Sequence, residues 1–323
     1  MCASVLDPQK QEISVPSYPE VDQALEAIAF PQQIGVVVTR LQQARVDWRL
    51  AHDRHAEHGV YFPSRQALQR ISRELKIALF PLRFGPPELT VQNENAYVDA
   101  ALESTLSQLA AQIRLERGYH RPDIDQKAVA NEVEQVIGAF ASELPAIRRL
   151  LDTDVEAGYA ADPAARSVDE VLLAYPSLTA VIHHRIAHRL YRLGAPLVAR
   201  VIAEIAHEKT GIDIHPGAQI GRSFFIDHGT GVVIGETTII GERVRLYQGV
   251  TLGGDPTLSG GGESKGIARH PVIGDDVVIH ANATLVGRIS IGARSIICGN
   301  IWLNRDVPQD SLVEPSPPSI RAL

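Results

Sequence analysis

Residues 212–252 read IDIHPGAQIGRSFFIDHGTGVVIGETTIIGERVRLYQGVTL, and residues 271–303 read PVIGDDVVIHANATLVGRISIGARSIICGNIWL. Within three runs an aliphatic residue returns at every sixth position, namely Ile214, Ile220, Ile226, then Ile234, Ile240, Leu246, Leu252, then Ile273, Ile279, Leu285, Ile291, Ile297 and Leu303. Glycine often follows directly, which suits a tight corner between short strands. Such a repeat is typical of a parallel β-helix, in which each unit buries its aliphatic side chain by stacking on its neighbours.

The repeat is interrupted twice. The step from Ile226 to Ile234 is eight residues, so two extra residues bulge out of the wall. Residues 253–270 are too rich in glycine and polar side chains to continue the wall, and we interpret them as an extruded loop. Interruptions of a regular scaffold are where function usually lies, and each of these carries a histidine, His228 and His270.

Composition excludes several classes of function. The 323 residues carry a net charge of −7 without any Lys/Arg block, which argues against nucleic acid or an anionic membrane as the main partner. The apolar runs are far shorter than a membrane span, and the first twelve residues lack the features of a secretory signal. The two cysteines, Cys2 and Cys298, provide no disulfide framework. We therefore expect a cytoplasmic protein.

The chain before the repeat is predicted to be helical. We expect a loose leader over residues 1–31, a helical N-terminal domain over 32–210, the β-helix over 211–308 and a tail over 309–323. Apolar spacing predicts helices at 34–56, 64–79, 95–117, around 129–140, around 147–155, at 179–193 and at 196–209. The predicted fold class is thus α+β, an all-helical domain followed by a left-handed parallel β-helix, the hand being implied by the resemblance described below.

Four histidines of the helical domain raise the question of a metal site: His183, His184, His188 and His207. His184 and His188 are four residues apart but lack the glutamate of a zinc-protease motif. We interpret these histidines as packing or solvent-exposed residues and expect no metal.

The histidines of the repeat have charged neighbours in the sequence. Asp227 precedes His228, and Arg269 precedes His270. Asp213 lies 15 residues before His228, which is one row of the β-helix away once the bulge is included. A carboxylate at that distance can fix the tautomer of the imidazole and leave its other nitrogen free to act as a general base.

Five motifs together resemble one family: Asp213-Ile214-His215-Pro216-Gly217, Asp227-His228-Gly229-Thr230-Gly231, Ile234-Gly235-Glu236-Thr237, Gln248-Gly249-Val250-Thr251-Leu252-Gly253-Gly254 and Arg269-His270-Pro271. They closely resemble the serine O-acetyltransferases, hexapeptide-repeat enzymes with a left-handed β-helix, and in particular the subgroup with a long helical N-terminal domain. The resemblance implies transfer of the acetyl group from acetyl-CoA to L-serine. The products would be O-acetyl-L-serine and CoA, in the activation step of cysteine biosynthesis.

The resemblance also implies residue roles. His228 matches the general base, Asp213 its orienting partner and His270 the second histidine of the family site. Arg269 matches the arginine that binds the serine carboxylate. The remaining matches are ligand-binding positions: Asp162 and Asp227 for the serine ammonium, and Gly253 and Ala281 along the pantetheine of acetyl-CoA.

Assembly follows from the same resemblance, because family members form their active site between neighbouring subunits. We expect a homotrimer or a hexamer. O-acetylserine sulfhydrylase is an implied partner, but the chain ends in Ser319-Ile320-Arg321-Ala322-Leu323 instead of the isoleucine tail that docks into it, which argues against a stable complex.

Three alternatives remain open on the sequence alone. An acyltransferase for a sugar or small amine would keep His228 but would not need Asp162, Asp227 and Arg269 together. A zinc hydrolyase on a similar helix would need three converging histidines for each metal. A non-catalytic assembly protein would use the helices as its functional part.

Overall fold

The computed structural model describes residues 30–51, 62–120, 125–255 and 266–315. The chain divides into two compact units, residues 1–60 and 61–323. The first contains helix α2 (Phe30–Ala51), where the sequence predicts a helix over 34–56. Most of the predicted leader, much of the extruded loop and the end of the tail lie outside the described residues.

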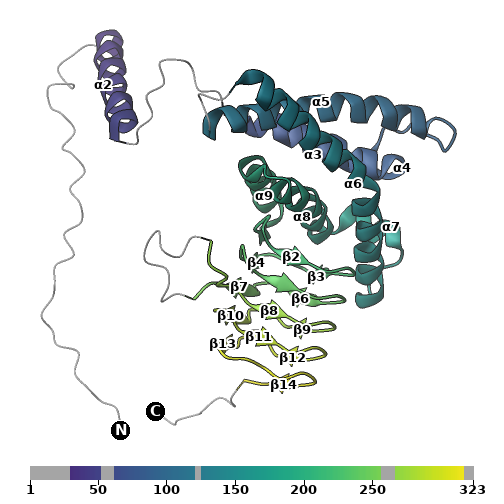
Figure 1. The fold of residues 1–323 in the computed structure, drawn as a ribbon. Helices are drawn as coiled ribbons and strands as arrows, with labels where there is room; N and C mark the ends of the chain where they lie inside the picture. Colours follow the sequence, from purple (N-terminus) through teal and green to yellow (C-terminus); the bar gives the residue numbers. More distant parts are fainter. Residues whose placement is uncertain (1–29, 52–61, 121–124, 256–265, 316–323) are drawn as a thin grey trace, which may run out of the picture. The chain divides into compact units, whose positions relative to one another are not determined.

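The second unit begins with helices and ends with short strands (Figure 1). Its helices are α3 (Arg65–Leu79), α4 (Pro81–Phe84), α5 (Glu94–His120), α6 (Gln126–Ala161), α7 (Val168–Ala174), α8 (Pro176–Arg192) and α9 (Pro196–Thr210). Ser64 caps α3 by accepting a hydrogen bond from the Ala67 amide, and Pro81 ends the helix, as the sequence predicts. No helix in the described ranges is long and apolar enough to cross a membrane.

Helix α6 corrects the prediction of two separate helices. It runs without interruption from Gln126 to Ala161, although Pro145 lies inside it. A proline in a helix interior costs about 3 kcal/mol, because it removes one hydrogen bond and clashes with the preceding turn. Phe140, Leu144 and Ile147, on both sides of the proline, are all buried in the core, and this packing offsets the cost.

The strands form three parallel sheets that share the coils of a β-helix (Figure 1). The first sheet contains β1 (Asp213–Ile214), β4 (Val233–Ile234), β7 (Thr251–Gly253), β10 (Thr284–Val286) and β13 (Trp302–Leu303). The second contains β2 (Gln219–Ile220), β5 (Ile239–Ile240), β8 (Val272–Ile273) and β11 (Ser290–Ile291). The third contains β3 (Phe225–Asp227), β6 (Arg245–Tyr247), β9 (Val278–Ile279), β12 (Ile296–Ile297) and β14 (Leu312–Val313).

The register confirms the hexad repeat as the origin of the β-helix. Ile226 pairs with Leu246, which pairs with Ile279, so residues of the repeat stack directly on one another. All three side chains are fully buried. The predicted α+β class, helices followed by a parallel β-helix, is confirmed. The last strand, β14, lies beyond residue 308, where the sequence places the end of the β-helix, and pairs with β12.

A buried ion pair joins the helices to the first coil. Arg185 of α8 contacts Asp154 of α6 at 3.0 Å, and both side chains are almost completely buried. Arg185 also donates to the carbonyl oxygens of Ile220 and Gly221, while Asp154 accepts a hydrogen bond from the Phe224 amide. Burial raises the pKa of Asp154, and the Arg185 charge opposes this rise. The contacts fix the helical layer against the β-helix.

Candidate active site

The first group of candidate residues, here called the His228 corner, lies where strand β3 ends: Asp162, Tyr175, Asp227, His228 and Arg245. His228 adopts a left-handed backbone conformation with φ of 58°, as other corner residues of the β-helix do. Its side chain is 74% exposed, and its Nε2 lies 3.8 Å from Oδ1 of Asp227. Asp227 itself forms an ion pair with Arg245 of the next coil. The imidazole is therefore open to a substrate and lies beside a carboxylate.

Asp162 enters the same corner from the helical layer. It follows α6 directly, and its carboxylate accepts hydrogen bonds from the Tyr175 hydroxyl and the Ala164 amide. These two bonds lower the pKa of Asp162, and the nearby charges of Arg245 and His228 add to the effect. The bond to Asp162 also raises the pKa of Tyr175 to about 12. Asp162 therefore stays ionised near neutral pH.

An open cavity of about 560 Å³ adjoins this corner. Its lining residues are His228, Tyr247, Gln248, His280, Ala281, Cys298, Gly299 and Asn300. The side-chain oxygen of Gln248 is buried and has no hydrogen-bond partner among the described residues. A volume of this size falls in the range of small-molecule sites, and an unsatisfied acceptor suits a ligand that brings an N–H group.

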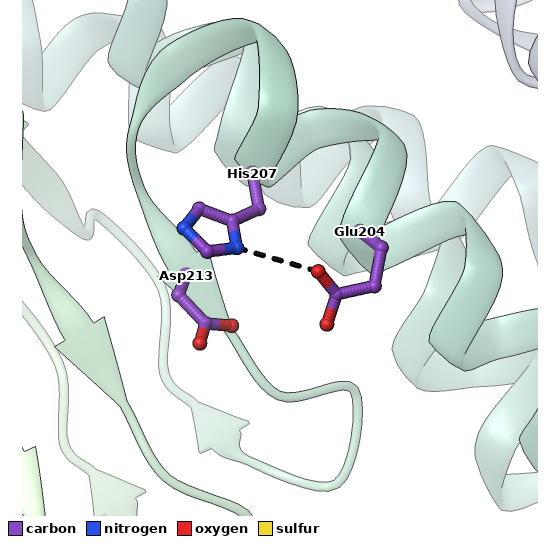
Figure 2. Close-up of side chains that lie close together, drawn as sticks. All are labelled: Glu204, His207 and Asp213. Atoms are coloured by element: carbon purple, nitrogen blue, oxygen red, sulfur yellow. Dashed lines mark hydrogen bonds and ion pairs between the residues drawn. The ribbon is translucent and has the colours of Figure 1, made fainter. Parts of the chain in front are cut away.

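In a single chain, Asp213 lies beside residues other than His228, its expected partner. Figure 2 shows it facing Glu204 and His207 of helix α9. Within the described residues no hydrogen bond or ion pair joins Asp213 to His228. The structure therefore places Asp213 on the outer side of β1, and the expected contact between the two residues stays a prediction.

The second group, here called the Arg269 corner, contains Tyr191, Glu236, Thr237, Arg269 and His270. Arg269 forms an ion pair with Glu236 at 2.9 Å, and Tyr191 donates to the other oxygen of that carboxylate at 3.1 Å. Burial alone would raise the pKa of Glu236, but the hydrogen bonds from Arg269 and Tyr191 lower it below its ordinary value. The guanidinium is thus held in place by a carboxylate that remains charged.

The tautomer of His270 follows from its hydrogen bonds. The Thr237 amide donates to Nδ1 of His270 at 3.1 Å, and the Thr237 hydroxyl lies 2.9 Å from the same atom. Because a backbone N–H can only donate, Nδ1 is unprotonated and the neutral ring carries its proton on Nε2. Burial, with the Arg269 charge as a second cause, lowers the pKa of His270 to about 4. His270 is therefore a neutral hydrogen-bond donor.

Gly235 makes this arrangement possible. A Cβ atom at that position would lie 1.9 Å from Cδ2 of His270, closer than any real contact. At Gly253 a Cβ would meet Thr251 and Val286 at an ordinary 3.5 Å. Packing within the chain therefore requires a glycine at position 235 and does not require one at position 253.

The structure brings the predicted site residues together in two sets. Asp162, Asp227 and His228 meet at one corner, with Ala281 in the adjoining cavity, and Arg269 and His270 meet at the other. No hydrogen bond or ion pair connects the two sets in the parts of the chain that are described. Gly253 lies in β7 and does not line the cavity.

Five residues at these corners have no role in the sequence-based prediction: Tyr175, Tyr191, Glu236, Thr237 and Arg245. Glu236 stands inside one of the family motifs, and Tyr175 stands before Pro176 at the start of α8. Arg245 lies in β6 of the next coil, where its register partner is Phe225, whereas the register partner of Asp227 is Tyr247. The stacking of β6 on β3 brings Arg245 close to Asp227, but the period of the repeat alone does not identify it as the partner of that carboxylate.

Comparison with known proteins gives a consistent result. No protein-family model matches the chain. A serine acetyltransferase of Synechococcus elongatus is 50% identical over 284 residues, which cover 86% of this chain and 89% of that protein. A serine acetyltransferase of Bacillus licheniformis is 49% identical over 165 residues, 51% of this chain and 73% of that protein.

Solved structures agree with these sequence matches. Serine acetyltransferase isoform 3 of Entamoeba histolytica in complex with cysteine has a TM-score of 0.67 at 36% identity and covers 78% of this chain and 84% of that chain. The Neisseria gonorrhoeae serine acetyltransferase in complex with serine has a TM-score of 0.50 at 32% identity. The match covers 78% of this chain and 95% of that chain. The chain therefore belongs to the serine acetyltransferase family and is an enzyme of that class.

Proposed function

We propose that this enzyme transfers the acetyl group of acetyl-CoA to the hydroxyl of L-serine and releases O-acetyl-L-serine and CoA. The observation that carries the proposal is the His228 corner, where an exposed imidazole lies beside the carboxylates of Asp162 and Asp227 and an open cavity. Relatives solved with serine and with cysteine support a small amino acid as the acceptor. The product would then serve cysteine biosynthesis.

Charge complementarity supports serine as the acceptor. Asp162 and Asp227 offer negative charge to the ammonium group, and Arg269 offers a planar guanidinium to the carboxylate. His270, with its proton on Nε2, donates a further hydrogen bond beside Arg269. A sugar or a simple amine lacks one or both of the charges that these groups recognise.

The transfer itself needs a base, because a hydroxyl is a poor nucleophile near neutral pH. His228 takes the hydroxyl proton as the serine oxygen attacks the thioester carbonyl carbon. The tetrahedral intermediate then expels the CoA sulfur, the C–S bond breaks, and the proton on His228 passes to the thiolate. His270 is unsuited to the role of base because its Nδ1 is occupied and its Nε2 is protonated.

Asp213 is proposed to orient His228 in the working enzyme. The support is its match to the family motif and its distance of 15 residues from His228, not a contact within the single chain. A carboxylate bonded to one ring nitrogen fixes the tautomer and stabilises the imidazolium that forms during transfer.

We further propose that the two corners meet between neighbouring chains of a homotrimer. Residues at both corners suit the same substrate, yet no bond links them within the described chain. A groove between two β-helices would bring the His228 corner of one chain to the Arg269 corner of the next. The helical domain is then free to join two trimers into a hexamer.

Acetyl-CoA is proposed to bind along the same groove. The pantetheine arm carries amide N–H groups, and Gln248 supplies an unsatisfied acceptor in the cavity beside His228 and Ala281. Packing within the chain leaves space for a Cβ atom at Gly253, yet the residue is a glycine. We propose that the missing side chain lets the pantetheine arm approach the backbone there.

The test is thiol release from acetyl-CoA with and without L-serine. We expect release to depend on L-serine and to be at least about 100-fold slower with sugars or simple amines, which lack the paired charges. Equal release with and without serine, or faster release with a sugar, would contradict the proposal.

A further inference from the structure

A cluster of three potential metal ligands lies where helix α9 meets the β-helix (Figure 2). Glu204 and His207 are three residues apart and share one face of α9, and Asp213 opens β1. Gly211 ends the helix in the left-handed conformation, with φ of 68°, and turns the chain so that Asp213 faces the last turn of α9. One ligand atom from each residue lies within 4.8 Å of the others.

The three ligand atoms have little else to bind. Nδ1 of His207 lies 3.3 Å from Oε2 of Glu204, while Arg200 occupies Oε1 of Glu204 at 2.5 Å. The Asp213 carboxylate accepts no hydrogen bond and forms no ion pair with any described residue. Two carboxylates thus converge on one imidazole, and Arg200 is the ion-pair partner of one of them, Glu204.

Local electrostatics favour a cation at this point. The carbonyl end of a helix carries partial negative charge, and the cluster lies at the C-terminal end of α9. One imidazole nitrogen with two carboxylate oxygens is a ligand set that Zn²⁺ accepts, with water in the remaining position. Ligand atoms around a tetrahedral zinc lie roughly 3.3 Å apart, so modest side-chain rotations would complete the site. All three side chains are partly exposed, which leaves them room for such rotations.

We propose that Glu204, His207 and Asp213 bind one Zn²⁺ ion and that its binding inhibits the enzyme. The inhibition rests on the proposed function, because Asp213 is the residue proposed to orient His228. A carboxylate that is bound to zinc is unavailable to the imidazole. On the sequence alone, His207 and the three other histidines of the helical domain are interpreted as packing or solvent-exposed residues, and no metal is expected. In the structure His207 lies beside Glu204 and Asp213, the residue proposed to orient His228.

The binding test uses the full-length protein after treatment with a chelator. Co²⁺ is titrated in and followed by its visible absorption, and Zn²⁺ is then added to displace it. We expect His207→Ala and Glu204→Gln to weaken binding by at least about 100-fold, the upper end of what loss of a ligand's supporting hydrogen bond costs. Glu208→Gln removes a neighbouring carboxylate of α9 outside the cluster and serves as the matched control. Equal binding by the wild type and all three variants would overturn the site.

The activity test measures loss of the thioester absorption, because a thiol assay would itself respond to zinc. We expect Zn²⁺ to inhibit the wild type and Glu208→Gln at least tenfold more strongly than His207→Ala. Specific Co²⁺ binding without inhibition by Zn²⁺ would overturn the inhibitory role, although it would support the metal site itself. An Asp213→Asn variant that stays fully active would instead show that the proposed role of Asp213 is wrong. The Co²⁺ titration would still decide whether the metal site exists, because it does not depend on activity. Circular dichroism melting confirms that each variant is folded.

Discussion

The two corners of the β-helix hold histidines in opposite states. His228 is exposed and makes no hydrogen bond with a described residue, whereas His270 is buried and both Thr237 groups occupy its Nδ1. A free imidazole can take a proton, and a ring whose tautomer is fixed can only donate its remaining one. The contrast supports the proposal that proton transfer occurs at the His228 corner and that the Arg269 corner binds the serine carboxylate.

The largest expected effect comes from removing the free imidazole. His228→Ala should lower kcat by roughly 100-fold to 10,000-fold, the usual contribution of a general base, and leave acetyl-CoA binding nearly intact. Steady-state kinetics and CoA titration on the same folded preparation measure both quantities.

His280→Ala is the matched control, since His280 lines the same cavity and stacks on Tyr247 at 5.0 Å. We expect its kcat to change less than tenfold. A well-folded His228→Ala enzyme that keeps more than about a tenth of the wild-type kcat would refute the base assignment.

The next largest effect concerns the binding corner. Arg269→Ala should reduce kcat/KM for serine by roughly 30-fold to 1000-fold, because a charge-assisted contact is worth about 2 to 4 kcal/mol. Glu236→Gln keeps the guanidinium but removes its charged partner, so its loss should be smaller. An unchanged kcat/KM in Arg269→Ala would show that this corner does not bind the acceptor.

A smaller effect tests the packing beneath His270. Gly235→Ala forces the ring to move and should cost about 1 to 3 kcal/mol of stability, typical of overpacking, with a loss of activity. Gly253→Ala should leave stability unchanged and raise the KM for acetyl-CoA. Urea unfolding and steady-state kinetics give both comparisons, and equal stability of the two variants would contradict the packing argument.

The smallest effect concerns acid stability. The pKa of His270 is lowered to about 4 in the folded protein, against an ordinary value of about 6.5, so the unfolded chain binds the proton more readily between these values. The contribution of His270 to stability is therefore complete above pH 6.5 and is lost as the pH falls towards 4. His270→Asn keeps an acceptor for the Thr237 amide without a titrating ring. We expect its urea midpoint to fall less between pH 7 and pH 5 than that of the wild type, and an equal fall would contradict this assignment.

The sequence predicts the β-helix well because one simple rule, burial at every sixth residue, acts in each coil. It predicts the grouping of Asp227 and His228 because they are adjacent, and the burial of Ile226 and Leu246 because they stack. The continuity of α6 through Pro145 was not predictable in the same way, since tertiary packing outweighs a local rule there.

The site was less predictable than the coils. Tyr175 lies 13 residues after Asp162 in the sequence, and Arg269 lies 33 residues after Glu236. No local sequence pattern therefore reveals either contact. Asp213 is the clearest case, because its facing residues Glu204 and His207 depend on the direction in which Gly211 turns the chain.

Subunit complementation tests the central claim most directly, namely that the two corners work together only between neighbouring chains. His228→Ala and Arg269→Ala chains are produced together in equal amounts, and the mixed oligomers are assayed against each variant alone. In a cyclic trimer each site takes one corner from each of two chains, so about a quarter of the sites in random mixtures are intact. We predict recovery of about a quarter of the wild-type activity. Activity no higher than the average of the two separate variants, in oligomers shown to contain both chains, would contradict the account.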